Sequence, residues 1–232
     1  MSSPVNFWYL EEVDLFEYFC PINGAKDFYD KMPKRNFKKG DQIYMTDDDA
    51  DKIFFIHEGA VKIAALQPDG QEVVRALLHP GEIFGELAVF GEEKRQEYAV
   101  ALEDSMICVL EKDQAIGLMR DVAPFREFFN QLIGQRVIFT QKRLEAIIFK
   151  DARTRIIEFV LDQARKVGRV KRGVVTLPNH LTHQEISSFT GTSRQTVTTV
   201  LNQLREKELF EFDRKKFMIL DMDALEAEIS KS

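Results

Sequence analysis

Cysteines, long apolar runs and an overall basic charge are all missing or scarce in this chain of 232 residues, and each absence excludes a class of protein. Two cysteines, Cys20 and Cys108, are too few and too far apart for a disulfide framework or an iron–sulfur cluster, so a reducing compartment is expected. No apolar run is long enough to cross a bilayer, and the first ten residues lack the basic and then apolar pattern of a secretory signal. The sequence therefore predicts a cytoplasmic protein that makes no contact with a membrane.

The net charge of −6 is unevenly distributed along the chain. Residues 151–220 hold 13 Lys and Arg against 8 Asp and Glu, whereas residues 1–150 carry a net charge of −8. A basic segment within an acidic protein is what an electrostatic contact with phosphates requires. With 44% apolar residues, the chain has enough material for two domains that each bury a core, and the C-terminal one is the candidate for nucleic acid.

Residues 182–206 have the pattern of two short helices joined by a tight turn at Gly191. Thr182 with Glu185, and Thr192 with Gln195, have the spacing of capping boxes, so a helix is predicted to begin at each. The apolar residues that recur at helical spacing are Ile186 and Phe189 in the first helix, and Val197, Val200, Leu201 and Leu204 in the second.

The second helix is predicted to present a polar face, most of it within the first two turns. The outward residues are Ser193, Arg194, Gln195, Thr198, Thr199 and Asn202. Arg can pair with guanine, Gln with adenine, Thr can contact thymine methyl groups or phosphates, and Ser193 at the helix start can bind phosphate. The alternative is a protein-packing module whose polar face is merely solvated. DNA binding is favoured, because such a solvated face usually carries Glu and Lys pairs, and here Glu appears only after Leu204.

A hairpin is predicted after this helix, with strands at 209–212 and 217–220. Its tip contains Asp213, Arg214, Lys215 and Lys216. A basic wing beside a recognition helix would hold the phosphate backbone and add affinity without sequence choice. Thr182, at the start of the first helix, completes the residues predicted to contact DNA.

Residues 37–110 show short apolar strands separated by glycines and acidic turns. The predicted strands are 42–45, 52–57, 60–66, 73–78 and 99–110. This regular spacing favours a small antiparallel barrel or jelly roll. The acidic run 47–51 lacks the ligand spacing of a calcium loop and is interpreted as a solvated connection. Residues 1 to about 35 are predicted to be partly helical and to pack on this domain.

One loop of the predicted barrel, residues 81–101, has the chemistry of an anion site. A short helical turn is predicted over Gly85, Glu86, Leu87 and Ala88, with free amides that could bind an anion and a Glu86 carboxylate that could accept from a ribose hydroxyl. Arg95 could pair with a phosphate. The alternative is a rigid corner in which Glu86 and Arg95 pair with each other.

A long helix is predicted from Pro124 to about Phe149. Its many apolar residues indicate burial on two sides, against its own barrel and against a second copy of the chain. A homodimer formed through residues 124–149 suits double-stranded DNA, because two recognition helices can then enter successive major grooves about 34 Å apart. The alternative is a helix buried wholly within one subunit.

Taken in order, these motifs resemble the Crp/Fnr family of bacterial transcription regulators, over almost the whole chain. The resemblance is carried by the barrel glycines, the box at 84–88 (FGELA), the long helix, and the segments at 182–186 (THQEI) and 191–197 (GTSRQTV). It implies an α+β fold: an antiparallel β-roll or jelly-roll barrel of the cyclic-nucleotide-binding type in residues 1–123, a dimerisation helix in 124–150 and a winged helix-turn-helix in 151–232. It also implies a non-enzymatic transcription regulator whose effector shifts the recognition helices, with RNA polymerase as a further partner.

The effector loop departs from the family members that bind cyclic AMP. Those members follow the box with an Arg-Ser-Ala run, where this chain has Arg95, Gln96 and Glu97; in the other register Gln96 and Glu97 take the two phosphate positions. Either register puts a carboxylate beside the phosphate site, and like charges about 4 Å apart repel by roughly 1 kcal/mol in water. Thr140 matches the Thr that reaches adenine, but Gln141 replaces its Ser neighbour. Cyclic AMP is thus disfavoured as the effector, and another small anionic molecule is the alternative.

On the second helix, Arg194 matches the Arg that pairs with guanine in the cyclic AMP receptor, whereas Gln195 replaces a Glu and Thr199 a second Arg. The resemblance therefore implies a half-site that keeps a guanine and differs beside it.

Three other functional classes are less favoured. Nucleotide sensing as the main property is one alternative. Haem or redox sensing through Cys20, His57 or His79 is another, although an Fnr-type cluster needs several N-terminal cysteines. An enzyme is disfavoured, because the four His residues show no metal-ligand spacing and no Ser or Cys lies in a nucleophile motif.

Overall fold

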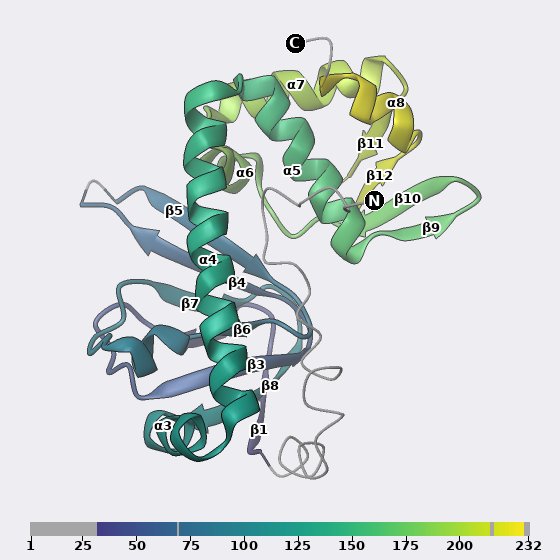
Figure 1. Cartoon of the computed structure of the whole chain (residues 1–232). Coiled ribbons are helices and arrows are strands. Elements are labelled where there is room, and N and C mark those ends of the chain that lie inside the picture. Colours follow the sequence, from purple (N-terminus) through teal and green to yellow (C-terminus); the bar gives the residue numbers. More distant parts are fainter. Residues whose placement is uncertain (1–31, 69, 214–215, 230–232) are drawn as a thin grey trace. The chain divides into compact units, whose positions relative to one another are not determined.

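The computed structural model describes residues 32–68, 70–213 and 216–229, in two compact units that divide after Arg136, within one long helix (Figure 1). The predicted helical segment before residue 32 lies outside the described residues. So do Arg214 and Lys215, at the tip of the predicted wing.

The N-terminal unit contains two antiparallel four-stranded sheets, which confirms the predicted barrel. One sheet has the order β1-β8-β3-β6 and the other β2-β7-β4-β5. The strands are β1 (Lys34–Phe37), β2 (Gln42–Tyr44), β3 (Lys52–Glu58), β4 (Val61–Leu66), β5 (Glu72–Leu78), β6 (Ile83–Phe84), β7 (Tyr98–Ala101) and β8 (Ser105–Glu111).

Strand β3 is apolar at consecutive positions because both of its faces are covered. Phe54 and Ile56 point into the core between the two sheets, where the Phe54 and Phe84 rings stack with centroids 4.9 Å apart. Ile53 and Phe55 point to the other side, toward helices α3 (Lys112–Asp121) and α4 (Ala123–Phe149). Because each face of β3 lies in its own apolar core, residues 53–56 of this strand are all apolar.

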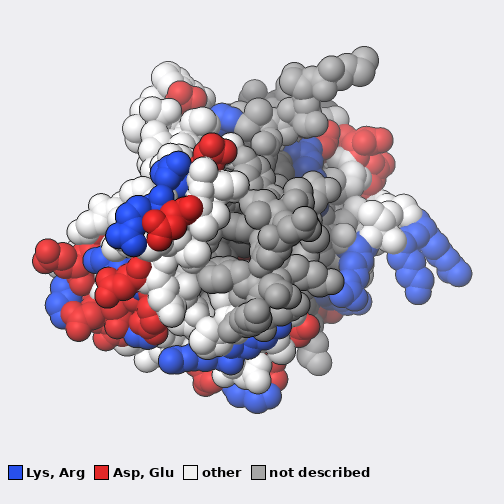
Figure 2. All heavy atoms as spheres, turned by 60° about the horizontal axis from the view of Figure 1, so that its bottom comes forward, with Lys and Arg blue, Asp and Glu red and all other residues white. Residues whose placement is uncertain are grey.

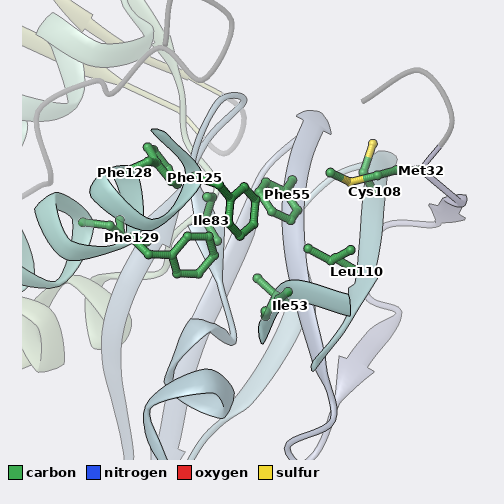
Figure 3. Packing of buried hydrophobic residues seen from close by; sticks show 11 residues of the cluster. Met32, Ile53, Phe55, Ile83, Cys108, Leu110, Phe125, Phe128 and Phe129 are labelled. Atoms are coloured by element: carbon green, nitrogen blue, oxygen red, sulfur yellow. The ribbon is translucent and has the colours of Figure 1, made fainter. Parts of the chain in front are cut away.

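The first half of α4 packs on the barrel. Phe125, Phe128, Phe129 and Leu132 are buried against the β3, β6 and β8 side chains, and Figure 3 shows the three Phe rings beside Ile83 and Phe55. Its second half, in the other unit, exposes large apolar side chains: Val137, Ile138, Leu144, Ile147, Ile148 and Phe149.

The C-terminal unit contains three helices of a helix-turn-helix domain and a third antiparallel sheet. The helices are α5 (Ala152–Val167), α6 (His183–Thr190) and α7 (Arg194–Glu206), followed by a short α8 (Met222–Ala227). The strands are β9 (Arg169–Lys171), β10 (Val174–Pro178), β11 (Phe210–Phe212) and β12 (Lys216–Ile219), in the order β11-β12-β10-β9. The α+β class and the winged helix-turn-helix are confirmed.

One predicted strand was wrong in extent. The segment 99–110 forms two strands in different sheets, β7 and β8, separated by a turn at residues 102–104. Ser105 opens β8 close to Gly59, where an added Cβ would lie only 2.7 Å from the Ser105 backbone. The chain passes from one sheet to the other at this turn, where the apolar residues of β7 are followed by Glu103 and Asp104.

Candidate nucleic-acid interface and effector turn

The first helix of the motif begins with the predicted capping box. The Thr182 hydroxyl accepts from the Glu185 backbone N–H at 3.2 Å, and the Glu185 carboxylate accepts from the Thr182 N–H at 2.8 Å. Helix α6 ends at Thr190 and is capped by Gly191, whose φ of +62° is left-handed. A residue with a Cβ is strained in this conformation, so glycine suits the turn that leads to α7.

Helix α7 begins one residue later than the second predicted capping box would place its start. Its N-cap is Ser193, whose hydroxyl accepts from the Thr196 backbone N–H at 3.0 Å. The prediction that Thr192 caps with Gln195 was wrong, because the Thr192 hydroxyl instead lies 3.1 Å from that of Thr190. Moving the start by one residue leaves Gln195 in the first turn with no capping role.

The two faces of α7 are divided as predicted. Val197, Val200, Leu201 and Leu204 are buried in the domain core. On the opposite face Ser193, Arg194, Gln195 and Thr199 are exposed, and Thr198 and Asn202 are half-buried. Arg194 and Gln195 therefore present a guanidinium and an amide to solvent from the first turn of a helix that its apolar face holds in place.

Thr198 differs from its exposed neighbours because its hydroxyl is already engaged. It donates to the Arg194 carbonyl at 2.9 Å and lies 2.9 Å from His183 Nδ1. Since its single hydrogen goes to the carbonyl, it accepts from an Nδ1–H tautomer of His183. The His183 ring meets the Phe212 ring edge-on in the wing. His183 thus connects α6, α7 and β11, a role that the sequence pattern gave no signal for.

The wing forms as predicted, from β11 and β12. Asp213 closes the hairpin, accepting from the Lys216 backbone N–H at 2.9 Å and donating its own N–H to the Lys216 carbonyl at 3.0 Å. Lys216 is exposed, as is Thr182 at the start of α6.

The effector turn of the barrel also forms, as a 3-10 helix η1 over Glu86–Phe90. Gly85 precedes it with a φ of +73°, and a Cβ there would lie 3.0 Å from the Lys52 carbonyl and from the Phe54 ring. Of the four residues predicted to form this turn, Gly85, Glu86 and Ala88 are buried, whereas Leu87 is exposed.

Glu86 is completely buried and forms an ion pair with Arg136 of α4, at 2.5 Å. Arg136 also donates to the Ile83 carbonyl at 2.7 Å. Burial raises the pKa of the Glu86 carboxyl, and Arg136 counteracts part of that rise. The alternative interpretation, a pair between Glu86 and Arg95, was wrong, because each of them has a different ionic partner.

Arg95 points into the protein and is only 2% exposed. Its Nη1 donates to the Gly85 carbonyl and to Glu92 Oε2, each at 3.1 Å, and its Nη2 donates to the Lys52 carbonyl. The guanidinium also lies 4.6 Å from the centre of the Tyr44 ring. An incoming phosphate would have to displace these contacts to reach Arg95.

The remaining residues of the predicted effector site do not face this interior. Gln96 and Thr140 are exposed. Glu97 pairs with Arg75 at 3.1 Å, and burial raises the pKa of its carboxyl. Arg95, Arg136 and Arg75 are therefore each paired with a carboxylate, those of Glu92, Glu86 and Glu97.

Among the described residues, no three His, Cys, Asp or Glu side chains are grouped to hold a metal ion. Cys108 is buried in the barrel core, and Cys20 lies outside the described residues. Among the described helices, none is long and apolar enough to span a membrane.

A winged helix-turn-helix joined through a long helix to an antiparallel barrel defines a DNA-binding transcription regulator with a sensor-type domain. The comparisons agree. Residues 34–121 match the cyclic nucleotide-binding domain, and residues 154–228 match the Crp-like helix-turn-helix domain.

Relatives match over most of the chain. A CRP-like cAMP-activated global transcriptional regulator of Mycobacterium tuberculosis is 25% identical over 190 residues, 82% of this chain and 85% of that protein. A global nitrogen regulator of Synechococcus elongatus is 25% identical over 214 residues, 86% of this chain and 92% of its own. The solved structure of a CRP family regulator from Thermus thermophilus has a TM-score of 0.71 at 25% identity, covering 84% of this chain and 96% of that one. The chain belongs to the Crp/Fnr family of transcription regulators.

Proposed function

We propose that this regulator binds DNA sequence-specifically as a homodimer paired through residues 124–149. The observation that carries the proposal is the exposed first turn of α7. Arg194 and Gln195 stand in solvent there, while the opposite face of the same helix is buried. A rigid helix that presents such side chains from its N-terminal turn has the geometry of a recognition helix in the major groove.

The side chains have separate roles in this proposal. Arg194 reads a guanine, Gln195 an adenine and Thr199 a thymine methyl group beside them. Ser193 and Asn202, with Thr182, contact the flanking backbone, and Thr198 joins them when its hydroxyl turns from the Arg194 carbonyl to a phosphate. Phosphates are also held by the wing, through Arg214, Lys215 and Lys216.

The second half of α4 supports the homodimer. Ile148 is 62% exposed and Phe149 81% exposed, beside Leu144 at 58%. Several large apolar side chains exposed along one helix are costly in water, and a second copy of the same helix would cover them symmetrically. The proposed organisation is therefore a barrel domain in 1–123, a dimerisation helix in 124–150 and a DNA-binding domain in 151–232.

Selection of binding sites from random duplexes tests the proposal. The expected consensus is a palindrome with a guanine in each half-site and half-site centres about one helical turn, roughly 34 Å, apart. Sedimentation of the protein–DNA complex should give two chains per duplex. An enriched site with a single half-site, or a monomer bound to the palindrome, would refute the homodimer.

Control by cyclic AMP is the second candidate function. It is supported by the match to the cyclic nucleotide-binding domain and by a relative named as cAMP-activated. Against it stand the three arginines of the effector region, each already paired with a carboxylate. A cyclic phosphate would bring a further negative charge to a site whose positive charges are neutralised, so we propose a different small effector or none.

Isothermal titration calorimetry separates the two candidates. We expect no heat of binding at micromolar cyclic AMP, and no tighter DNA binding when the nucleotide is added. Micromolar binding that disappears in Arg95→Ala and is retained in Lys94→Ala, an exposed neighbour, would instead establish the protein as a cyclic AMP sensor.

We also propose that the protein has no catalytic activity, that it is located in the cytoplasm and that RNA polymerase is a further partner. The first is supported by the relatives, which are named as regulators. Incubation of the purified protein with cyclic AMP should leave the nucleotide intact by chromatography.

A further inference from the structure

The C-terminal end of α6 carries three backbone carbonyls that accept hydrogen bonds from arginines. The last carbonyls of a helix have no partner within it and attract cationic donors. The Phe189 carbonyl accepts from Arg143 Nη2 at 2.8 Å. The Thr190 and Gly191 carbonyls accept from Arg155, through Nε at 2.8 Å and Nη2 at 2.9 Å. The turn before the recognition helix is therefore held by two guanidinium groups.

These two arginines come from different elements. Arg155 belongs to α5, is 8% exposed and also donates to the Lys150 carbonyl at 2.5 Å. It fixes the turn from within the helix-turn-helix domain. Arg143 belongs to α4, the proposed dimerisation helix, and its guanidinium also lies 4.6 Å from the centre of the Phe189 ring. Because a guanidinium is planar, a hydrogen bond combined with stacking restricts it to one orientation.

An apolar contact on the same face of α4 accompanies Arg143. Ile147 follows four residues later, so the two side chains lie on one side of the helix. A Cβ built on Gly191 would meet Ile147 Cγ1 at 3.7 Å, so Ile147 lies beside the turn. This stretch of α4 thus contacts the turn with both a polar and an apolar side chain.

We propose that Arg143 is a positioning residue that fixes the angle between α4 and the α6–α7 pair, and through it the spacing of the two recognition helices. The inference rests on the proposed homodimer, because α4 is the element that the two copies share. Without Arg143, the domain keeps its own fold through Arg155 but pivots at the junction between Lys150 and Asp151. The dimer then accepts half-sites at several spacings.

The test uses the full chain and the palindrome obtained by selection, together with duplexes lengthened or shortened by two base pairs at the centre. Two base pairs turn one half-site relative to the other by about a fifth of a helical turn. The native protein should prefer the parental spacing by about tenfold or more, a difference of ~1.4 kcal/mol, and Arg143→Met should reduce this preference to about threefold or less. Lys142→Met, which removes the neighbouring positive charge on the same helix, should keep the native ratio.

The outcomes separate positioning from stability. The Arg143→Met protein could bind all duplexes more weakly by the same factor and keep the native ratio of affinities for the parental and altered spacings. Arg143 would then have only a structural role, and the inference would be overturned. A native protein without any spacing preference would instead refute the homodimer, on which the inference depends. If circular dichroism shows that Arg143→Met does not fold, Arg143→Lys decides, since it keeps the charge but loses the planar stacking. An unchanged ratio in that variant overturns the inference.

Discussion

At the scale of single residues, Arg194 and Gln195 owe their exposure to what surrounds them. Ser193 caps the helix and Val197 anchors it, so the side chains of Arg194 and Gln195 extend into solvent from a fixed backbone. Little conformational entropy of the backbone remains to be lost when they meet a base, and pre-organisation of this kind favours sequence-specific contact.

Arg194→Ala should therefore weaken binding to the selected site by about 1–3 kcal/mol and relax specificity at one base pair. Fluorescence anisotropy with duplexes that vary each base pair in turn measures both effects. Glu206→Ala, at the exposed end of the same helix, is the matched control and should bind as the native protein does. Equal weakening on selected and random duplexes would show that Arg194 contacts only the backbone.

His183 gives the domain a dependence on pH. Burial and then the nearby Arg194 lower the pKa of His183 below its ordinary value of 6.5. The folded state therefore takes up a proton less readily than the unfolded chain. The free energy of unfolding has its full value above about pH 6.5 and decreases as the pH drops below it. His183→Asn, which keeps a donor near Thr198 but cannot titrate, should reduce this fall.

Thermal unfolding of both proteins, followed by circular dichroism from about pH 7.5 to 5.5, measures the difference. Subtracting the two curves removes the contribution of the other histidines. Parallel curves would show that His183 has the same pKa in the folded and unfolded states.

At the scale of elements, α4 has two environments along one helix. Its first half buries Phe128 and Phe129 completely against the barrel, whereas its second half leaves Ile147 and Ile148 about half exposed. The same apolar composition thus serves a core within the chain and, in the proposed function, a contact between copies.

Ile148→Glu should dissociate the dimer, because it places two carboxylates in an apolar contact. Sedimentation velocity at micromolar concentration should show a monomer that retains the native circular dichroism spectrum, with weakened binding to the palindrome. Val170→Glu introduces the same charge at an apolar side chain that is 73% exposed in β9, outside α4, and should remain dimeric. A dimeric Ile148→Glu protein would mean that the copies meet elsewhere.

At the scale of the whole molecule, an acidic protein carries a basic DNA-binding part. In Figure 2 acidic and basic side chains mix at the left of the view, and a group of Lys and Arg lies at the far right. The hairpin formed by β9 and β10, which projects at the right of Figure 1, carries the exposed Lys171 and Arg172. That hairpin ends at the opposite end of the sheet from the wing, because β10 pairs with β12 so that Pro178, not Val174, lies beside Lys216. Only the wing end is proposed to contact DNA.

DNA affinity should consequently fall with salt despite the net charge of −6. Lys216→Met should lower the slope of log affinity against log salt by about 0.9 for each phosphate that the variant no longer neutralises, or roughly 2 for a dimer. Titrations at several salt concentrations measure the slope. Lys171→Met in β9 removes an equal charge at the other end of the sheet and should keep the native slope. A lower slope in both variants would indicate a general effect of the net charge rather than a contact between Lys216 and a phosphate.

Much of the fold and of the division of α7 into a buried and an exposed face could be predicted from the sequence, because the signals are local. The buried stripe of α7 follows from helical spacing, and the capping box at Thr182 needs only Glu185 three residues on. Short elements such as β6, β9 and α8 were not predicted, since a few residues carry too little periodicity. The cap at Ser193 was misassigned because Thr192 offers the same hydroxyl one residue earlier.

The sequence by itself determined the long helix, the helix-turn-helix that follows it and the exposed polar face of α7, because periodicity, caps and turns act within a few residues. Only the tertiary structure decided the ionic partners in the effector region. Arg95 donates to the carbonyl of Lys52, and Glu86 pairs with Arg136, fifty residues further along. No local pattern links such positions, since the partner of a buried charge depends on which elements the packing of the core brings together.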